Sequence, residues 1–396
     1  MNIKQRTEEL YPELVQIRRE LHQHPEPGLE EHWTSAYICG LLDKWGISYE
    51  FPVAGTGIVA VIQGQKPGAG NTVALRADMD ALPLTEDSSR PYCSLNPGRM
   101  HACGHDAHVA IALGTARILM ESRDQWPGWV KFLFQPAEET TGGALPMVEA
   151  GCMEHPRVDY VTGLHVMPTH ETGEIEIRYG DLNASSDEIH IKVHGKSCHG
   201  AYPDTGVDAI VMAGAVINSL QTLISRSISP LDNAVLTLGT IHGGTAGNIV
   251  AGEVEMTGTL RTTDPSVRQK IIDAMTRQVS CTCQAMGGSG EVVIVPGYAA
   301  LINSDEIVDV LAETAAELLG SQHIHQKKFP SLGVEDFSFF LEKAKGVFYH
   351  LGCASREKGI TAPLHSQDFD IDETCLKLGV ELQASLALKL LKRNIV

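Results

Sequence analysis

The sequence predicts an α/β protein in which a mostly parallel, mixed sheet is covered by helices and a smaller α+β domain is inserted into it. Short apolar runs alternate with helical stretches over the first 180 residues and again near the C-terminus, which is the pattern of a parallel sheet between helices. The stretch between them has its own β-α-β-β-α-β order. A chain of 396 residues also exceeds what one hydrophobic core usually supports. We therefore expect one domain at 1–184 and 296–396 and an inserted domain at 185–295.

Four apolar runs in the first domain are predicted to be buried strands, and polar residues follow each of them. Open α/β sheets place their ligand sites beyond the carboxyl ends of such strands. The runs are Thr72–Arg76 before Asp78 and Asp80, Val130–Phe134 before Glu138 and Glu139, Tyr160–Leu164 before His165, and Val347–Leu351 before a loop that reaches His365.

The elements of the inserted domain follow from alternation and helical periodicity. Ile189, Ile191 and Val193 alternate with polar residues, as in a half-buried strand. The other expected elements are a helix at 209–223, strands around 234–241 and 253–261, a helix at 266–286 and a strand near 292–295.

Both ends of the chain are predicted to be helical, and no segment is predicted to enter a membrane. Leucine and isoleucine recur at helical spacing from Leu10 to Leu21, and an amphipathic helix is expected at 373–392. The N-terminal segment has no uninterrupted apolar run like that of a signal peptide. Because no other segment reads as apolar enough to span a bilayer, a cytoplasmic location is expected.

Charge and cysteine content exclude further classes of protein. Thirty-one Lys and Arg against 49 Asp and Glu give a net charge of −18, which repels phosphate backbones and anionic membranes, so neither is expected as a partner. Nine cysteines at irregular spacings favour reduced thiols over a disulfide framework. Cys281 and Cys283 form a pair without the second pair that a four-ligand zinc site needs.

The segment 100–108 (MHACGHDAH) packs one thiol, three imidazoles and a carboxylate into nine residues. Cys103 and His105 are expected on a non-helical turn before a helix that begins near Val109, so both can face one divalent transition metal ion. The alternative is a polar loop in which Asp106 caps the helix and the histidines are solvated.

Two adjacent carboxylates and two isolated histidines add to this pattern. Glu138 and Glu139 follow a buried strand, where like charges repel unless a cation or a proton neutralises one of them. One carboxylate can bind metal while the other accepts a proton; a solvated pair is the alternative. His165 and His365, each ordinary when considered alone, fit the same site.

Six motifs together resemble the aminoacylase and hippurate hydrolase-like metallopeptidases, a family of N-acyl-amino-acid amidohydrolases that includes the indoleacetyl-amino-acid hydrolases. The resemblance covers essentially the whole chain, and the motifs occur in the family's order. They are RADMDALP (76–83), MHACGHDAH (100–108), FQPAEE (134–139), GLHV (163–166), GVEDF (333–337) and PLHS (363–366).

The resemblance implies a catalytic dimetal domain with two divalent ions per chain, Zn, Mn or Co and by extension Ni, and an inserted dimerisation and lid domain. By this resemblance the metal ligands would be Cys103, His105, Glu139, His165 and His365. Glu138 would be the general base, and Asp80 would orient a ligand.

The resemblance also assigns His199, Asn248 and Arg261 to the substrate side of the site. His199 would stabilise the developing oxyanion, and Arg261 would grip a carboxylate, although it also reads as a surface ion pair. Asp204 and Ala251 depart from the usual His and Pro, which places the lid in question. A homodimer or dimer of dimers is implied, in which His199 reaches the partner's metal site.

The expected activity is metal-dependent hydrolysis of the amide bond of N-acyl amino acids, small molecules that carry N-acetyl, N-benzoyl or other acyl groups. Three alternatives remain. A dipeptidase or carboxypeptidase would act on unblocked peptides, a cysteine hydrolase would use Cys103 as its nucleophile, and a binding protein would keep the fold without catalysis. The cysteine mechanism leaves Glu138 and Glu139 unexplained.

Overall fold

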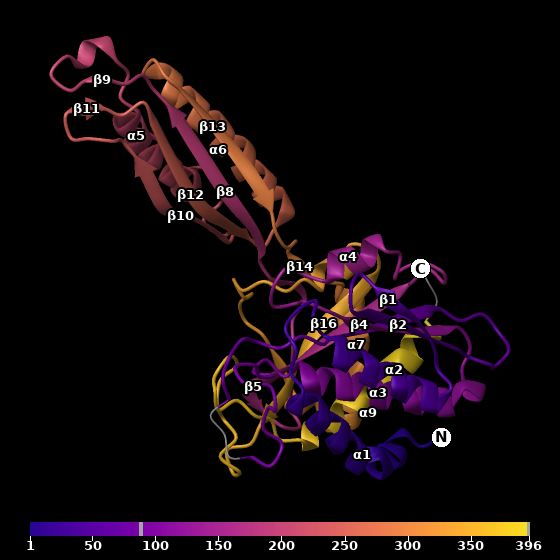
Figure 1. Cartoon of the computed structure of the whole chain (residues 1–396). Coiled ribbons are helices and arrows are strands. Elements are labelled where there is room, and N and C mark those ends of the chain that lie inside the picture. The colour runs from indigo at the N-terminus through magenta and orange to yellow at the C-terminus, as the bar shows by residue number, and fades with distance from the viewer. Residues whose placement is uncertain (87–89, 394–396) are drawn as a thin grey trace. The chain divides into compact units, whose positions relative to one another are not determined.

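The computed structural model describes residues 1–86 and 90–393 and divides into two compact units (Figure 1). Unit 2 begins at Asp181, includes the region predicted as the inserted domain, and ends beyond it. The backbone of Ser331 pairs with Leu182 and Ala184 at 2.8 and 3.0 Å, which ties a short later segment to unit 2. Unit 1 comprises 1–180, 303–328 and 336–396, and unit 2 comprises 181–302 and 329–335.

Unit 1 is built on a mixed sheet, and this confirms the predicted fold class. In chain order its strands are β1 (Ser48–Val53), β2 (Gly57–Gln63), β3 (Thr72–Asp78), β4 (Trp129–Gln135), β5 (Tyr160–Glu171), β6 (Ile175–Ile177), β15 (Ile324–Gln326) and β16 (Lys345–Ala354). Across the sheet the described strands follow the order β1-β2-β4-β3-β5-β16-β6-β15. The central strands β4, β3, β5 and β16 are parallel neighbours. Their carboxyl ends therefore meet at one edge.

The helices of unit 1 include three that pack against one another, α1, α3 and α9. The helices are α1 (Ile3–Gln23), α2 (His32–Trp45), α3 (His105–Glu121), α4 (Ala144–Glu149), α7 (Asp305–Leu319), α8 (Ser338–Leu341) and α9 (Thr374–Leu390). Nearly all of α3 is buried, on every face. The prediction that this helix begins near Val109 was wrong, because it begins at His105.

Unit 2 is an antiparallel sheet with two helices packed on it. Its sheet strands are β8 (Ser185–His194), β10 (Ala234–Gly243), β12 (Glu253–Thr262) and β13 (Ser289–Pro296), in the order β10-β12-β8-β13. Helices α5 (Ala209–Thr222) and α6 (Pro265–Ala285) bury their apolar sides in a separate core. Short strands β7 (Gly180–Asn183), β9 (Cys198–His199), β11 (Ile249–Val250) and β14 (Leu301–Asn303) complete the described strands.

One helical segment corrects the prediction that nothing in the chain is apolar enough to span a bilayer. Ala209–Ser227 comprises α5 and the short π-helix that follows it. By length and composition this segment is apolar enough to cross a membrane. Met212, Val216 and Leu220 on one of its faces are buried in the core of unit 2. The core helices of soluble proteins pass the same test, so the finding is weak evidence for a membrane span.

Candidate metal centre

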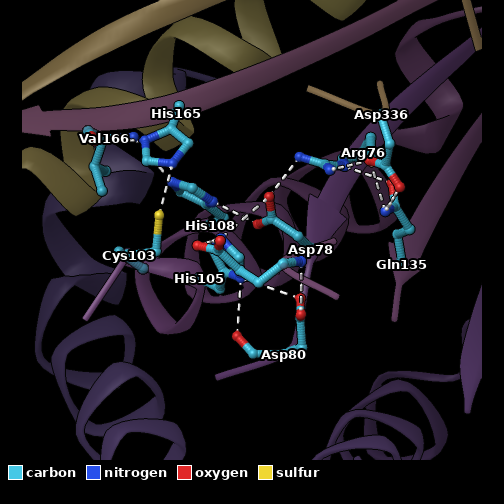
Figure 2. Close-up of polar contacts among 12 residues, drawn as sticks. Arg76, Asp78, Asp80, Cys103, His105, His108, Gln135, His165, Val166 and Asp336 are labelled. Atoms are coloured by element: carbon cyan, nitrogen blue, oxygen red, sulfur yellow. Dashed lines mark hydrogen bonds and ion pairs between the residues drawn. The ribbon is translucent and has the colours of Figure 1, made fainter. Parts of the chain in front are cut away.

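The five predicted ligands and the predicted base Glu138 converge at the edge of unit 1 where the parallel strands end. Figure 2 shows Cys103, His105 and His165 facing one another, with Asp80 behind His105. Ligand atoms lie within 4.8 Å of one another in each of three overlapping groups. The groups are Cys103 with His105 and His165, Cys103 with Glu139 and His365, and His105 with Glu138 and Glu139.

The turn that carries Cys103 depends on glycine. Gly104 precedes α3 with a φ of 87°, and a Cβ placed there would lie 2.3 Å from Val166. Any other residue would strain the backbone and collide with β5. Cys103 and His105 therefore stand on either side of a glycine that lets the turn approach the strand carrying His165.

His365 and Glu139 close the other side of the cluster. His365 Nε2 lies 3.1 Å from Glu139 Oε1 and 3.4 Å from Cys103 Sγ. His365 has a φ of 60°, which is unusual for a residue other than glycine. Its backbone N–H donates to Ala102 O at 2.8 Å, which fixes the loop beside Cys103. A strained backbone at a site usually reflects a functional constraint.

Two histidines are oriented by hydrogen bonds that leave one ring nitrogen for a ligand. His105 Nδ1 lies 2.8 Å from Asp80 O, and His165 Nδ1 lies 2.7 Å from Val166 O. Because a carbonyl oxygen only accepts, each Nδ1 must carry its hydrogen. Nε2 of each ring then faces the cluster, and His165 Nε2 lies 3.2 Å from Cys103 Sγ. This is how histidines that bind metal are usually held.

The residues present fit two divalent transition metal ions. His105 Nε2 and Glu139 Oε1 are excluded from solvent without an aligned hydrogen bond, and they lie 4.0 Å apart. Such groups are costly unless something binds them, and a cation roughly 2.0–2.2 Å from each would satisfy both. The thiol, imidazole and carboxylate set suits Zn, Mn or Co.

The protonation states are consistent with this fit. Burial raises the pKa of the Cys103 thiol well above its usual range. Burial also lowers the pKa of His165 well below its usual range, which favours the neutral ring that a metal ligand requires. Burial alone would lower the pKa of His105, but Asp78 and Asp80 raise it well above its usual range. Cation binding would therefore displace protons from Cys103 and His105.

Asp80 supports two ligands at once. Its carbonyl oxygen accepts from His105, and its Oδ2 accepts from the backbone N–H of Glu139 at 2.9 Å. The contacts are those of a residue that orients ligands. Glu138, the predicted base, belongs to the group of His105 and Glu139.

A buried network that was not predicted from the sequence lies beside the ligands and comprises Asp78, His108 and Arg76 (Figure 2). His108 Nδ1 lies 2.5 Å from Asp78 Oδ1, and His108 Nε2 accepts from Val166 N at 2.9 Å. Arg76 pairs with Asp78 at 2.5 Å. His108 lies three residues after His105, on the same face of α3. This spacing would have predicted that the two side chains are neighbours, had the helix been expected to begin at His105.

Asp106 is not the capping residue of a solvated loop. It is buried and pairs with Arg18 at 2.7 Å and His22 at 2.8 Å. The side chain of Arg18 is fully buried and also pairs with Asp370 at 2.9 Å. The loop alternative for segment 100–108 is therefore wrong, because the segment is buried almost throughout.

The three residues assigned to the substrate side lie in unit 2, where two of them lie together. His199 pairs with Ile249, and Gly200 N donates to Asn248 O at 2.8 Å, so exposed His199 and Asn248 are neighbours. Arg261 pairs with Ser186, near the start of β8. The part of β8 from that row to its end spans roughly 26 Å. Arg261 therefore lies toward the opposite end of the sheet.

The model of the peptidase family M20/M25/M40 matches residues 74–389. The chain belongs to this family. A crystal structure from Bacillus subtilis described as a dinuclear metal-binding peptidase of family M20 has a TM-score of 0.83 and 32% identity, covering 97% of this chain and 99% of that one. The resemblance inferred from the six motifs is confirmed.

Two M20 relatives carry names that describe different activities. The thermostable carboxypeptidase 2 of Saccharolobus solfataricus is 41% identical over 98% of each chain. The N-acetylcysteine deacetylase of Bacillus subtilis is 36% identical over 96% of this chain and 97% of its own length. The M20 protein described here is accordingly a dinuclear-metal amidohydrolase or peptidase, as predicted.

Proposed function

We propose that this M20 enzyme hydrolyses the amide bond of N-acyl amino acids and releases a carboxylic acid and a free amino acid. The observation that carries the proposal is the second carboxylate, Glu138, beside the ligands His105 and Glu139 within 4.8 Å. A set of ligands alone would bind metal; a neighbouring carboxylate adds a group that can move a proton. The similarity to a deacetylase supports the substrate class.

The bound ions would polarise the amide carbonyl and lower the pKa of water. Glu138 accepts the proton of the attacking water and returns it to the nitrogen of the leaving amine. The backbone N–H of Glu139 donates to Asp80, and the side chain of Glu139 contacts His365. These contacts hold Glu139 in place as a ligand. Of the two adjacent carboxylates, Glu138 therefore transfers the proton and Glu139 binds metal.

His199, Asn248 and Arg261 are proposed to bind the substrate. His199 would donate to the developing oxyanion, and Arg261 would bind the α-carboxylate of the amino acid with two parallel hydrogen bonds. Their separation within one unit exceeds the length of a small N-acyl amino acid. One substrate could contact both only if the residues come from different chains, which supports the proposed dimer.

The deciding experiment depletes the enzyme of metal, restores Mn, Co or Zn, and compares N-acetyl and N-benzoyl amino acids with unblocked dipeptides. We expect activity to return with metal and kcat/KM to be higher for the N-acyl compounds. Activity that survives complete metal removal would favour the cysteine mechanism. Higher kcat/KM for unblocked peptides would establish the carboxypeptidase alternative, which the 41% identity with a carboxypeptidase favours.

A further inference from the structure

A row of polar side chains crosses the sheet of unit 1 away from the metal centre. His350 of β16 pairs with Glu176 of β6, and Glu176 pairs with His325 of β15. His165, one of the predicted ligands, pairs with His350 at the other end of this row. Three strand spacings separate His165 from His325, which amounts to about 14 Å. The outer end of the row is therefore distinct from the dinuclear centre.

Two further groups meet His325 at the outer end. His170 lies near the end of β5, Glu174 lies in the turn before β6, and one ligand atom from each of the three residues lies within 4.8 Å of the others. Glu174 Oε1 is 3.3 Å from His325 Nε2, and Glu174 Oε2 is 3.9 Å from His170 Nδ1. The two imidazole rings are stacked, with centroids 5.2 Å apart. Ligands around a tetrahedral zinc ion stand about 3.3 Å apart, so small side-chain rotations would complete the geometry.

Glu174 is held in place by its own turn. Gly173 has a φ of 102°, which permits the tight reversal between β5 and β6. Glu171 N donates to Glu174 Oε2 at 3.1 Å, and Gly352 N donates to Glu174 O at 2.9 Å. The carboxylate thus loses little conformational freedom when it binds a cation.

Glu176 orients the histidine on the opposite side. His170 Nε2 lies 3.5 Å from Glu176 Oε1. The other oxygen of Glu176 lies 2.7 Å from His350 Nδ1 and 3.1 Å from Lys327 Nζ. A carboxylate that binds the second nitrogen of a histidine is the usual support of a metal ligand.

The ion-pair contact of His325 Nε2 is with Glu174 Oε1, at 3.3 Å. This nitrogen is excluded from solvent and makes no aligned hydrogen bond, although 42% of the side chain is exposed. A nitrogen that is shielded from solvent and lacks an aligned hydrogen bond is unfavourable. A cation between this nitrogen, His170 and Glu174 would bind its lone pair.

We propose that His170, Glu174 and His325 form a second, mononuclear site for a divalent transition metal ion, with Glu176 as the orienting carboxylate. Two imidazoles and one carboxylate are the ligands that Zn²⁺ takes in open sites. The same ligands disfavour Ca²⁺ and Mg²⁺, which prefer oxygen. Solvent would supply the fourth position, because the three side chains are 18%, 27% and 42% exposed.

Occupation of this site would fasten β15 to the rest of the sheet. β15 is the last strand in the described order and is paired on one side only, with β6. An ion held by His325 of β15 and by His170 and Glu174 would bridge the edge strand and the β5–β6 turn. Zinc should therefore slow amide hydrogen exchange in Ile324–Gln326.

The test is equilibrium dialysis of the full chain at buffered free zinc concentrations, with bound zinc measured by elemental analysis. Wild type and the control His323→Gln, which changes a neighbouring histidine, should bind three ions per chain at saturation. His325→Gln and Glu174→Gln should bind two and lose the zinc-dependent protection of β15. Glu176→Gln should lower the affinity for the third ion by about 10- to 100-fold.

Two results would overturn the proposal. One is a wild-type chain that binds no zinc beyond the dinuclear centre; the other is a His325→Gln chain that binds as much zinc as wild type. Cys103→Ala separates this site from the catalytic one. That variant should lose zinc from the dinuclear centre and keep the zinc-dependent protection of β15. An error in the assignment of the dinuclear centre and an error in the outer site would therefore give different results.

Discussion

Glu138 and Glu139 are adjacent in sequence, yet their substitution by Gln should affect different quantities, kcat for Glu138 and metal affinity for Glu139. Burial raises the pKa of Glu139, but contact with His365 and the charge of His105 overcome it and bring the pKa from 4.5 to about 2. At 1.36 kcal/mol per pKa unit, the surroundings favour the charged carboxylate by about 3 kcal/mol. The side chain is only 14% exposed, so solvent screening reduces this little.

Glu139→Gln removes that charge and keeps the shape of the side chain. The neutral amide attracts a cation far less than the carboxylate does, so the affinity for at least one ion should fall by roughly 100-fold. Glu138→Gln should retain both ions and lower kcat by about 10²- to 10⁴-fold, the usual contribution of a general base. Metal content by elemental analysis and kcat with an N-acetyl amino acid measure the two effects separately.

The exposed Glu149→Gln serves as the control and should change neither quantity. If Glu138→Gln lost metal while Glu139→Gln kept it, the assignment of base and ligand would be reversed. A further check uses pH on the metal-free protein. Because the folded pKa of Glu139 is depressed, its stabilisation is present above about pH 4.5 and is lost as the pH falls toward about 2. The stability difference between wild type and Glu139→Gln should shrink over that range.

Three other perturbations have defined outcomes. Arg18→Met should lower the free energy of unfolding by about 3–5 kcal/mol in urea denaturation, because it removes the buried cation that pairs with both Asp106 and Asp370; a loss below about 1 kcal/mol would contradict this. Metal binding should release protons, since the buried Cys103 thiol has a raised pKa, and calorimetry in buffers of different ionisation enthalpy would detect them; a heat independent of the buffer would refute it. Mixed inactive His199→Ala and Glu138→Ala chains should recover up to roughly a quarter of wild-type activity after subunit exchange, whereas no recovery despite exchange would place His199 in its own chain's site.

The sequence predicted the main features of unit 1 because apolar runs dominate its sheet. The strands expected at 72–76 and 130–134 became β3 and β4 with small extensions. The rule that polar residues gather beyond the carboxyl ends of parallel strands then brought distant segments together. Cys103 and His165 are far apart in sequence, and their ligand atoms lie 3.2 Å apart.

Contacts made by short or polar segments could not be predicted in this way. The segment around Ser331 joins unit 2 through backbone hydrogen bonds, and such bonds leave no mark on residue type. The start of α3 was placed too late because Gly104 and a run of polar residues read as a loop. Those polar residues are buried in ion pairs, and only tertiary contacts reveal this.

The ligands of the metal centre differ in how firmly the fold holds them. The side chain of His105 is 1% exposed and Cys103 is 7% exposed, on a turn and helix packed against the sheet. The side chain of His365 is 54% exposed and lies in a loop. His365 is positioned by its backbone bond to Ala102 and by contacts with Glu139 and Cys103. Two of these three contacts are with other ligands, which a shared ion would hold together. Metal removal would therefore take support from His365 and leave the support of His105 by Asp80 intact. Metal removal should therefore loosen the His365 loop first, and the buried side of the centre should stay formed.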